Sequence, residues 1–297
     1  MRRGVVVALV GYVLWGLSPI FWRLGEGSAG DILVLRILST ITLLVLIQMV
    51  RDRGAEVRAR LADRRVRFAV LGSSLLLASN WLGFIWAVTS DRVLEASLGY
   101  FLNPLVSVVL GVTVLGERLR RGQWVAIALA GVGVAILSID LGSLPWISLF
   151  LAVTFGLYGL VRKTAPVESL DGLTLEVAAM APFAAIALGM FTADGDGLST
   201  VIGLGGWAWV AGASLMTAAP LLLFGWAARR IPLSLVGVLQ YLTPTLQFLL
   251  GVLAYDESWS GGQVVGYVVI WTGLVLFAAD GLATARHTAA RRDVSRR

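Results

Sequence analysis

The sequence predicts an all-α integral membrane protein with ten transmembrane helices, arranged as two five-helix repeats of inverted topology. Three observations predict it: a very apolar composition, ten apolar segments close to spanning length, and one constant offset that relates the two halves of the chain. Of the 297 residues, 58% are hydrophobic and 14% are charged, and the mean hydropathy is +0.84. Soluble globular domains carry about 25% charged residues, so this composition indicates a chain embedded in lipid.

The ten expected helices follow from the length that a bilayer demands. A transmembrane helix needs about 20 largely apolar residues to cross the hydrocarbon core. Ten segments meet or approach this length, namely 5–22, 32–50, 68–88, 93–115, 123–139, 146–161, 173–192, 207–228, 233–254 and 263–282. The first resembles a signal peptide, but its apolar stretch is long and no A-x-A site follows, so we expect a spanning helix. We expect the one longer charged linker, residues 51–67, to be a solvated or lipid-surface loop.

The distribution of positive charge predicts the orientation of the chain. Cytoplasmic loops of membrane proteins are enriched in Lys and Arg. With the N-terminus inside, the predicted cytoplasmic segments contain 21 of the 24 Lys and Arg residues, and the outer loops contain only Arg23 and Arg92. Ten helices return the chain to its starting side, so we expect both termini in the cytoplasm, with a basic tail at 283–297. The net charge of +6 then indicates contact with anionic lipid, not with nucleic acid.

One offset of 140 residues relates the two halves and predicts a repeat at 5–140 and a second at 145–282. The shift pairs Leu-Asn-Pro at 102–104 with Leu-Thr-Pro at 242–244, Gly111 with Gly251, Glu117 with Glu257, and Asp140 with Asp280. Because each repeat has five helices, the second enters the membrane from the opposite side. Inverted repeats are typical of secondary transporters, whose substrate sites lie near the bilayer midplane between the repeats.

Polar residues interrupt the fourth and ninth helices at mid-length. Helical spacing and the offset place them on matching faces: Tyr100, Asn103 and Ser107 in the fourth helix, and Gln240, Thr243 and Gln247 in the ninth. Pro104 and Pro244 each remove a backbone hydrogen bond at the same depth, which predicts a kink in each helix. We interpret the stripes as walls of a central cavity. The alternative is that they hydrogen-bond helices to one another, as polar residues in membrane bundles often do.

Four stretches resemble the RarD branch of the EamA-type drug/metabolite transporter superfamily: NWLGFIWAV (80–88), EASLGYFLNPL (95–105), PLLLFGWAARR (220–230) and LQYLTPTLQFLLGV (239–252). The resemblance covers nearly the whole chain. It implies an EamA basket of ten helices in the bacterial cell (inner) membrane, lined mainly by the first, third, fourth, sixth, eighth and ninth helices. RarD-like proteins are named for a link to chloramphenicol sensitivity, and that name identifies no cargo.

Aromatic and amide side chains are expected on the walls of the basket. Aromatic faces with a few amides can hold flat or amphipathic molecules. The predicted cavity residues are Trp15, Ser18, Asn80, Phe84, Tyr100, Asn103, Ser107, Tyr158, Gln240, Tyr241, Thr243 and Gln247. The alternative for several of the 11 Trp residues is an interfacial belt, which we prefer for Trp207 and Trp209.

Charged residues fall inside the predicted helices, among them Arg36, Glu95 and Glu176. Each costs roughly 2.5–3.5 kcal/mol at the centre of a helix on insertion scales. Arg36 and Glu176 are related by the offset, but they lie about one turn from opposite surfaces, so they cannot pair. We expect Arg36 to pair with Glu95 in the outer leaflet. The candidate partners of Glu176 are Arg162, Lys163 and Arg229. Such pairs act either as braces between helices or as gates.

The expected function is that of a permease or exporter that works by alternating access. No carboxylate or cation lies at the midplane, which favours a small neutral, zwitterionic or amphipathic metabolite or drug. Glu95 could carry a proton, and uniport or exchange fits the sequence equally well. We expect a small-molecule substrate and the lipid bilayer as partners, and no nucleic acid.

An enzyme is the less favoured class. The chain has no Cys and one His, His287 in the tail, and neither G-x-S-x-G nor H-E-x-x-H occurs. We therefore expect no catalytic residues, no metal and no cofactor. A further alternative is a membrane partner without transport activity, or a structural protein that forms a homodimer. Its sequence signal is GQVVG at 262–266, a G-x-x-x-G motif that can serve as a dimer face.

Overall fold

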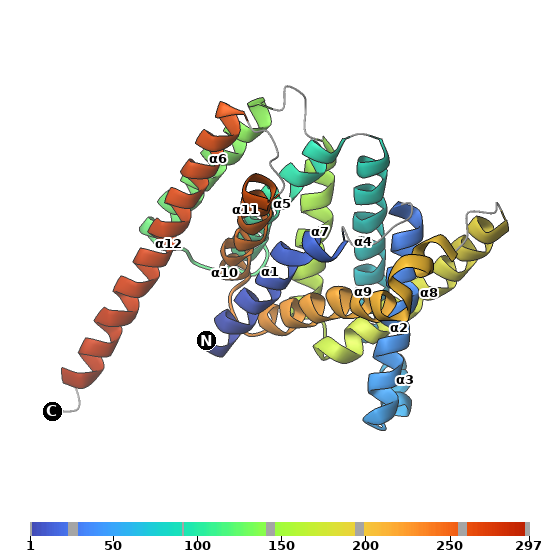
Figure 1. The fold of residues 1–297 in the computed structure, drawn as a ribbon. Coiled ribbons are helices and arrows are strands. Elements are labelled where there is room, and N and C mark those ends of the chain that lie inside the picture. Colours follow the sequence, from blue (N-terminus) through green and yellow to red (C-terminus); the bar gives the residue numbers. More distant parts are fainter. Residues whose placement is uncertain are drawn as a thin grey trace.

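The computed structural model describes residues 2–22, 29–90, 92–140, 146–193, 199–254 and 260–294, except for some side chains near helix ends, among them Glu95 and 281–294. The elements of these residues are all helices (Figure 1). They are α1 Arg2–Trp22, α2 Ala29–Val50, α3 Gly54–Arg60, α4 Arg64–Thr89, α5 Val93–Thr113, α6 Arg121–Asp140, α7 Trp146–Thr164, α8 Ser169–Ala193, α9 Ser199–Ala228, α10 Leu233–Gln240, α11 Leu242–Ala254 and α12 Gly261–Val294.

The helices have the lengths and composition that the sequence predicts. Within the described residues, nine helical segments are long and apolar enough to cross a membrane, and the apolar part of α5, Leu98–Thr113, is somewhat shorter. One of the nine segments, Leu233–Leu250, runs through α10 and α11. The chain is therefore a multi-pass membrane protein. The helix α12 continues to Val294, so the segment expected as a basic tail is helical as far as that residue.

The packing of the helices obeys the offset of 140 residues. Gly16 on α1 lies against Leu246 on α11, and the equivalent Gly156 on α7 lies against Val106 on α5. Arg120 forms a salt bridge with Asp280. The equivalent positions, Ser260 and Asp140, are joined by a hydrogen bond that the Ser260 hydroxyl donates at 2.6 Å. Because these contacts have counterparts in which the two repeats swap roles, the bundle has the two-fold relation of an inverted repeat.

The glycines of the G-x-x-x-G motif are used inside the chain. The helix α6 lies side by side with the first part of α12 (Figure 1). A Cβ on Gly262 would meet Asp140, and a Cβ on Gly266 would meet Leu137 and the backbone of Gly133. Small residues let two helix backbones approach closely. Here they bring α12 onto α6 of the same molecule, so this face is not open for a second copy of the chain.

The linker at 51–67 is more ordered than the solvated or lipid-surface loop that we expected. It contains α3, and Val57 and Val66 are buried in a small cluster that also includes Val167 and Leu175. Arg53 and Arg60 donate hydrogen bonds to the carboxylate of Glu56, which lowers the pKa of that group to about 2. The expectation missed a short amphipathic helix because the charged residues dominate its composition.

The ninth spanning segment is broken, whereas the fourth is continuous. The helix α10 ends at Gln240 and α11 begins at Leu242, and the Tyr241 amide bonds to the Val238 carbonyl, which is the tighter spacing of a 3₁₀ turn. Pro244 has no amide to donate to the Gln240 carbonyl four residues earlier. Pro104 holds the equivalent position in α5, which remains helical from Val93 to Thr113. The two repeats therefore differ at this depth.

Candidate functional site

An aromatic cluster joins α1 to α7 and α9. The ring of Trp15 on α1 lies 5.7 Å from Phe155 on α7 and 5.9 Å from Phe224 on α9, measured between centroids. Tyr158 stacks on Phe224 at 6.1 Å. Trp15 and Tyr158, both predicted to line the cavity, thus belong to one cluster that spans the two repeats.

A second contact between the repeats is the crossing of α5 and α10. Gly237 lies so close to α5 that a Cβ there would fall 2.7 Å from the Pro104 carbonyl oxygen and 2.8 Å from the Ser107 Cβ. Such an approach requires a residue without a side chain. The crossing places Asn103 and Gln240 close to the boundary between the repeats, where they are 3% and 4% exposed.

Two amide oxygens near this crossing have no hydrogen-bond partner among the described residues. They are Oδ1 of Asn103 and Oε1 of Gln240, and both atoms are buried. A buried polar atom without a partner destabilises a fold by about 1–3 kcal/mol, and native proteins leave few of them. Two buried acceptors near the crossing are therefore without a described donor.

Other residues predicted for the cavity instead bind helices together. The Thr243 hydroxyl donates to the Tyr12 carbonyl at 3.1 Å, and the Gln247 amide donates to the Trp15 carbonyl at 3.4 Å. The Asn80 amide on α4 donates to the Leu151 carbonyl on α7 at 2.9 Å. These contacts are interhelical hydrogen bonds. For Thr243 and Gln247, the alternative interpretation of the polar stripes, that they bond helices to one another, is therefore the one that the structure supports.

The remaining predicted residues occupy three further environments. Phe84 on α4 and Tyr100 on α5 form an edge-to-face pair at 6.1 Å. The Ser18 hydroxyl donates within its own helix to the Trp15 carbonyl at 2.8 Å. Ser107 is 4% exposed beside Gly237. Phe84 and Tyr100 thus form an aromatic contact between α4 and α5.

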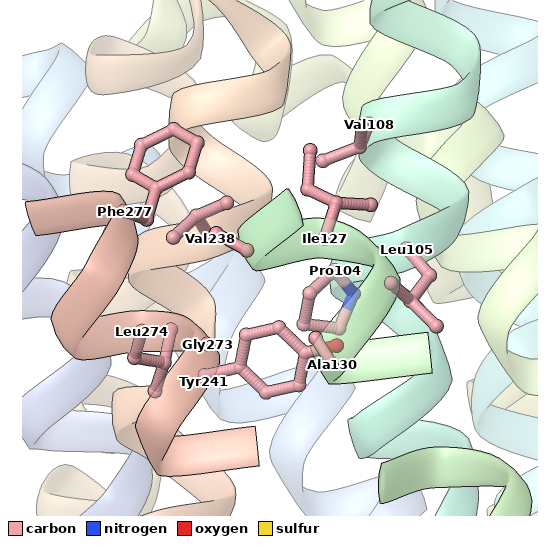
Figure 2. Close-up of a pocket in the computed structure, with 11 residues that line it drawn as sticks. Pro104, Leu105, Val108, Ile127, Ala130, Val238, Tyr241, Gly273, Leu274 and Phe277 are labelled. Atoms are coloured by element: carbon pink, nitrogen blue, oxygen red, sulfur yellow. The ribbon is translucent and has the colours of Figure 1, made fainter. Parts of the chain in front are cut away.

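Tyr241 borders a different cavity. Figure 2 shows its ring with Pro104, Leu105, Val238 and other apolar side chains around a small pocket between α5, α6, α10 and α12. The Tyr241 hydroxyl is buried and has no partner among the described residues. Because Tyr241 follows Gln240 by one residue, it points about 100° around the helix and faces the paired helices α6 and α12.

The expected belt position is wrong for Trp209. Its side chain is 6% exposed and stacks on Phe21 at 5.6 Å, whereas Trp207 is 76% exposed. Trp22 also packs against Trp209, edge to face at 6.1 Å. The sequence does not reveal this because the position of a Trp along a helix does not tell which face meets protein and which meets lipid.

The intramembrane charges Glu176 and Arg162 are neutralised within the second repeat. Arg162 Nη1 donates to Glu176 Oε1 at 3.1 Å, and the hydroxyls of Ser73 and Tyr158 donate to the same carboxylate at 2.6 and 3.2 Å. Of the three candidate partners, Arg162, Lys163 and Arg229, it is thus Arg162 that pairs with Glu176. Lys163 instead donates to two backbone carbonyls at the end of α9, those of Ala228 and Ile231.

Arg36 has a different environment. Its guanidinium carbon lies 4.7 Å from the ring centroid of Trp22 and 5.1 Å from that of Trp81, and its Nε donates to the Thr217 hydroxyl at 3.2 Å. The Glu95 side chain lies outside the described part of the structure, so the expected pair of Arg36 with Glu95 stays a prediction.

Sequence reasoning missed the role of Glu117. Its carboxylate accepts hydrogen bonds from the backbone amides of Leu233 and Ser234, at 2.6 and 2.9 Å, and from the Ser234 hydroxyl at 2.6 Å. It therefore caps the N-terminus of α10, where an anion is favoured. The sequence shows that a Glu recurs at this position in both repeats, Glu117 and Glu257. It does not show that this Glu meets the start of a helix from the other repeat.

The fold is that of a multi-pass membrane protein, and the comparisons with known proteins define its class as a transporter. Residues 2–139 match the model of the EamA-like transporter family. An uncharacterized transporter of Pseudomonas aeruginosa is 43% identical over 96% of both chains. The protein RarD of Streptomyces exfoliatus is 40% identical over 98% of this chain and 92% of its own, and that of Escherichia coli is 39% identical over 97% of each. The chain belongs to the RarD branch of this family.

The fold itself recurs in solved structures. One crystal structure superposes with a TM-score of 0.69 at 20% sequence identity, over 93% of this chain and 97% of that one. At this level of identity the likeness establishes the fold alone. The family describes a permease and not an enzyme.

Proposed function

We propose that the chain moves a small neutral, zwitterionic or amphipathic metabolite or drug across the bacterial inner membrane by alternating access. The observation that carries the proposal is the pair of buried amide oxygens without partners, Asn103 Oδ1 and Gln240 Oε1. A solute with N–H or O–H donors would satisfy them and would recover the free energy lost in their burial. The nearby aromatic cluster offers ring faces for an apolar body.

Alternating access would follow from the repeated contacts. We take the repeats as residues 5–140 and 145–282. Contacts such as Gly16 with Leu246 and Gly156 with Val106 are equivalent under the offset. Each repeat could therefore adopt the conformation of the other and keep equivalent contacts, which would open the protein to the opposite side of the membrane. The break at Tyr241 supports this proposal, since it supplies a point about which α10 can move against α11 without loss of regular hydrogen bonds.

The orientation with both termini in the cytoplasm assigns a conformation to the structure. Lys163 then lies near the cytoplasmic end of α7, Glu117 lies between the cytoplasmic ends of α5 and α6, and both join elements far apart in sequence. Gly4 lies against Ile231 at the same end, where a Cβ would fall 2.6 Å from that side chain. These contacts support a state closed toward the cytoplasm, with Glu117 as a latch that must release α10 before this end opens.

Transport by the purified protein tests the proposal. The wild type, reconstituted in sealed vesicles, is assayed for uptake and efflux of radiolabelled metabolites, amphipathic drugs and chloramphenicol. We expect transport of at least one solute, and we expect Asn103→Ala and Gln240→Ala to reduce it while folding in detergent is retained. Vesicles that transport nothing, beside a working control transporter, would favour the membrane partner without transport activity.

A matched comparison separates binding from packing. Thr243→Ala removes an interhelical hydrogen bond at the same depth, but its hydroxyl already has a partner. We expect Thr243→Ala to lower stability more than transport per folded molecule. Equal loss of transport and stability in all three variants would contradict a role for the two amides in binding.

A further inference from the structure

Arg36 lies where both repeats converge. Its guanidinium on α2 contacts Trp22 on α1, Trp81 on α4 and the Thr217 hydroxyl on α9. Its contacts therefore come from two other helices of the first repeat and one of the second, and the Arg36 side chain remains partly exposed.

The described surroundings of Arg36 hold no negative charge. No salt bridge joins it to any carboxylate whose side chain the structure describes, and its described contacts are two indoles and a hydroxyl. A cation over an aromatic face gains about 0.5–2 kcal/mol, whereas a charge at the centre of a spanning helix costs roughly 2.5–3.5 kcal/mol or more. The indoles therefore only partly offset the burial of this charge.

The donors of Arg36 are arranged for an anion with two oxygens. Nε bonds to Thr217, and no described residue accepts a hydrogen bond from Nη1 or Nη2. A guanidinium binds a carboxylate through two parallel N–H bonds at its edge. The indoles of Trp22 and Trp81 lie against the guanidinium but accept no hydrogen bond from Nη1 or Nη2. Their faces offer apolar surface to the rest of a bound molecule.

We infer that Arg36 binds a carboxylate of the transported solute, so that the substrate is an organic carboxylate with an apolar body. The inference rests on the proposed function and narrows its substrate class. The inference also gives a use to Asn103 Oδ1, a buried acceptor without a described partner, which a donor elsewhere on the same solute would satisfy.

The contrast with Arg162 supports the choice of Arg36. Arg162 is buried against Glu176 and also donates from Nη2 to the Ser169 carbonyl at 2.8 Å. Its charge is neutralised, so it has no need of a ligand. Arg230 lies 3.7 Å from the Trp226 ring, but it is exposed at the end of α9 and water can solvate it. Arg36 combines aromatic walls, partial burial and unused terminal donors.

Calorimetric titration of matched solutes tests the inference. The protein in nanodiscs of phosphatidylcholine is titrated with 3-phenylpropionate, indole-3-acetate and butyrate, each beside its primary amide, which has nearly the same shape but no charge. We expect at least one acid to bind about tenfold more tightly than its amide, a difference of about 1.4 kcal/mol. Arg36→Gln should abolish the preference and leave the affinity for the amide unchanged. Arg230→Gln, which alters an exposed Arg–Trp pair, should change neither.

A second measurement does not require replacement of Arg36. If the acid binds beside Trp22, the change in tryptophan fluorescence that it causes should diminish in Trp22→Phe. It should persist in Trp124→Phe, where the replaced indole is 50% exposed on α6. The inference is overturned if no acid is preferred over its amide, or if the preference survives in Arg36→Gln. A signal equally strong in both Trp variants also contradicts it.

Transport assays distinguish a failure of this inference from a failure of the proposed function. If the vesicles transport the amides as well as the acids, the proposed transport function is supported, but the inference that Arg36 selects the substrate is contradicted. If the protein prefers acids through Arg36 but transports no solute, the carboxylate-binding site is supported and the proposed transport function is contradicted.

Discussion

Arg162 donates a hydrogen bond to Glu176 at 3.1 Å, and both side chains are almost wholly buried. The offset of 140 residues relates these positions to Trp22 and Arg36, which also touch, with the guanidinium 4.7 Å from the indole ring. The same two helix positions therefore hold an ion pair in one repeat and a cation on an aromatic ring in the other. The duplication preserved the contact and changed its chemistry, so at these two positions the second repeat holds a paired cation and the first repeat holds a cation without a described counter-ion.

Breaking the buried ion pair should destabilise the protein more than removing it. Glu176→Gln or Arg162→Met leaves one charge unpaired in low dielectric, for which we expect a loss of roughly 3–5 kcal/mol. The double variant removes both charges and should recover part of that loss. Unfolding in mixed micelles, followed by circular dichroism, measures the three variants. Additive effects would show that the two side chains stabilise the fold independently.

Asn103→Ala and Thr243→Ala should have opposite effects on stability, although they replace polar residues at equivalent depths. Asn103→Ala removes a buried oxygen without a partner, so the free energy of unfolding should stay level or rise. Thr243→Ala removes a bond to the Tyr12 carbonyl and should lower the free energy of unfolding by about 1 kcal/mol. Thermal unfolding of the solubilised proteins checks both. Equal destabilisation would indicate that Asn103 is also part of the packing.

Pro244→Ala should slow turnover more than Pro104→Ala. The break between α10 and α11 lies three residues before Pro244, whereas α5 is continuous through Pro104. Alanine would supply the missing amide and favour a straight ninth helix, which should hinder bending and leave the contacts to the solute unchanged. Initial transport rates over a range of solute concentrations separate the two effects. A change confined to apparent affinity would contradict a hinge at this point.

Arg36 and Glu95 should form a pair in at least one conformation. If they do, Arg36→Gln and Glu95→Gln should each reduce stability more than the double variant does, because each leaves a lone charge in the membrane. Glu95→Gln should also tighten the binding of a carboxylate, since the side chain would no longer compete for Arg36. If all three variants are as stable as the wild type, the pair acts neither as a brace nor as a gate.

Both termini and the segment around α3 should face the cytoplasm. The chain has no Cys, so single cysteines at positions 60 and 92 can be labelled with a membrane-impermeant maleimide. In intact spheroplasts, position 92 should react and position 60 should react only after the membrane is opened. Labelling of position 60 from outside would reverse the orientation, and Glu117 would then close the outer end.

The sequence by itself determined the class, the number of spans and the symmetry. These follow from properties that are local or periodic along the chain. Apolar length gives the helices, the positions of Arg and Lys predict the orientation, and the offset of 140 residues predicts which contacts recur. Even the pairing of Glu176 with Arg162 was among three candidates, because depth in a membrane restricts which charges can meet.

Only the tertiary structure decided which polar side chains are already partnered. Thr243 and Gln247 share a helical stripe with Gln240, yet they donate to carbonyls on α1 while the Gln240 oxygen has no described partner. Helical spacing gives the face on which a side chain lies. The partner depends on the rotation and crossing point of a neighbouring helix, which are determined by packing contacts such as Gly237 on Pro104. The use of the G-x-x-x-G motif inside the chain was undetermined for the same reason, because a motif specifies a close approach but not the helix that approaches.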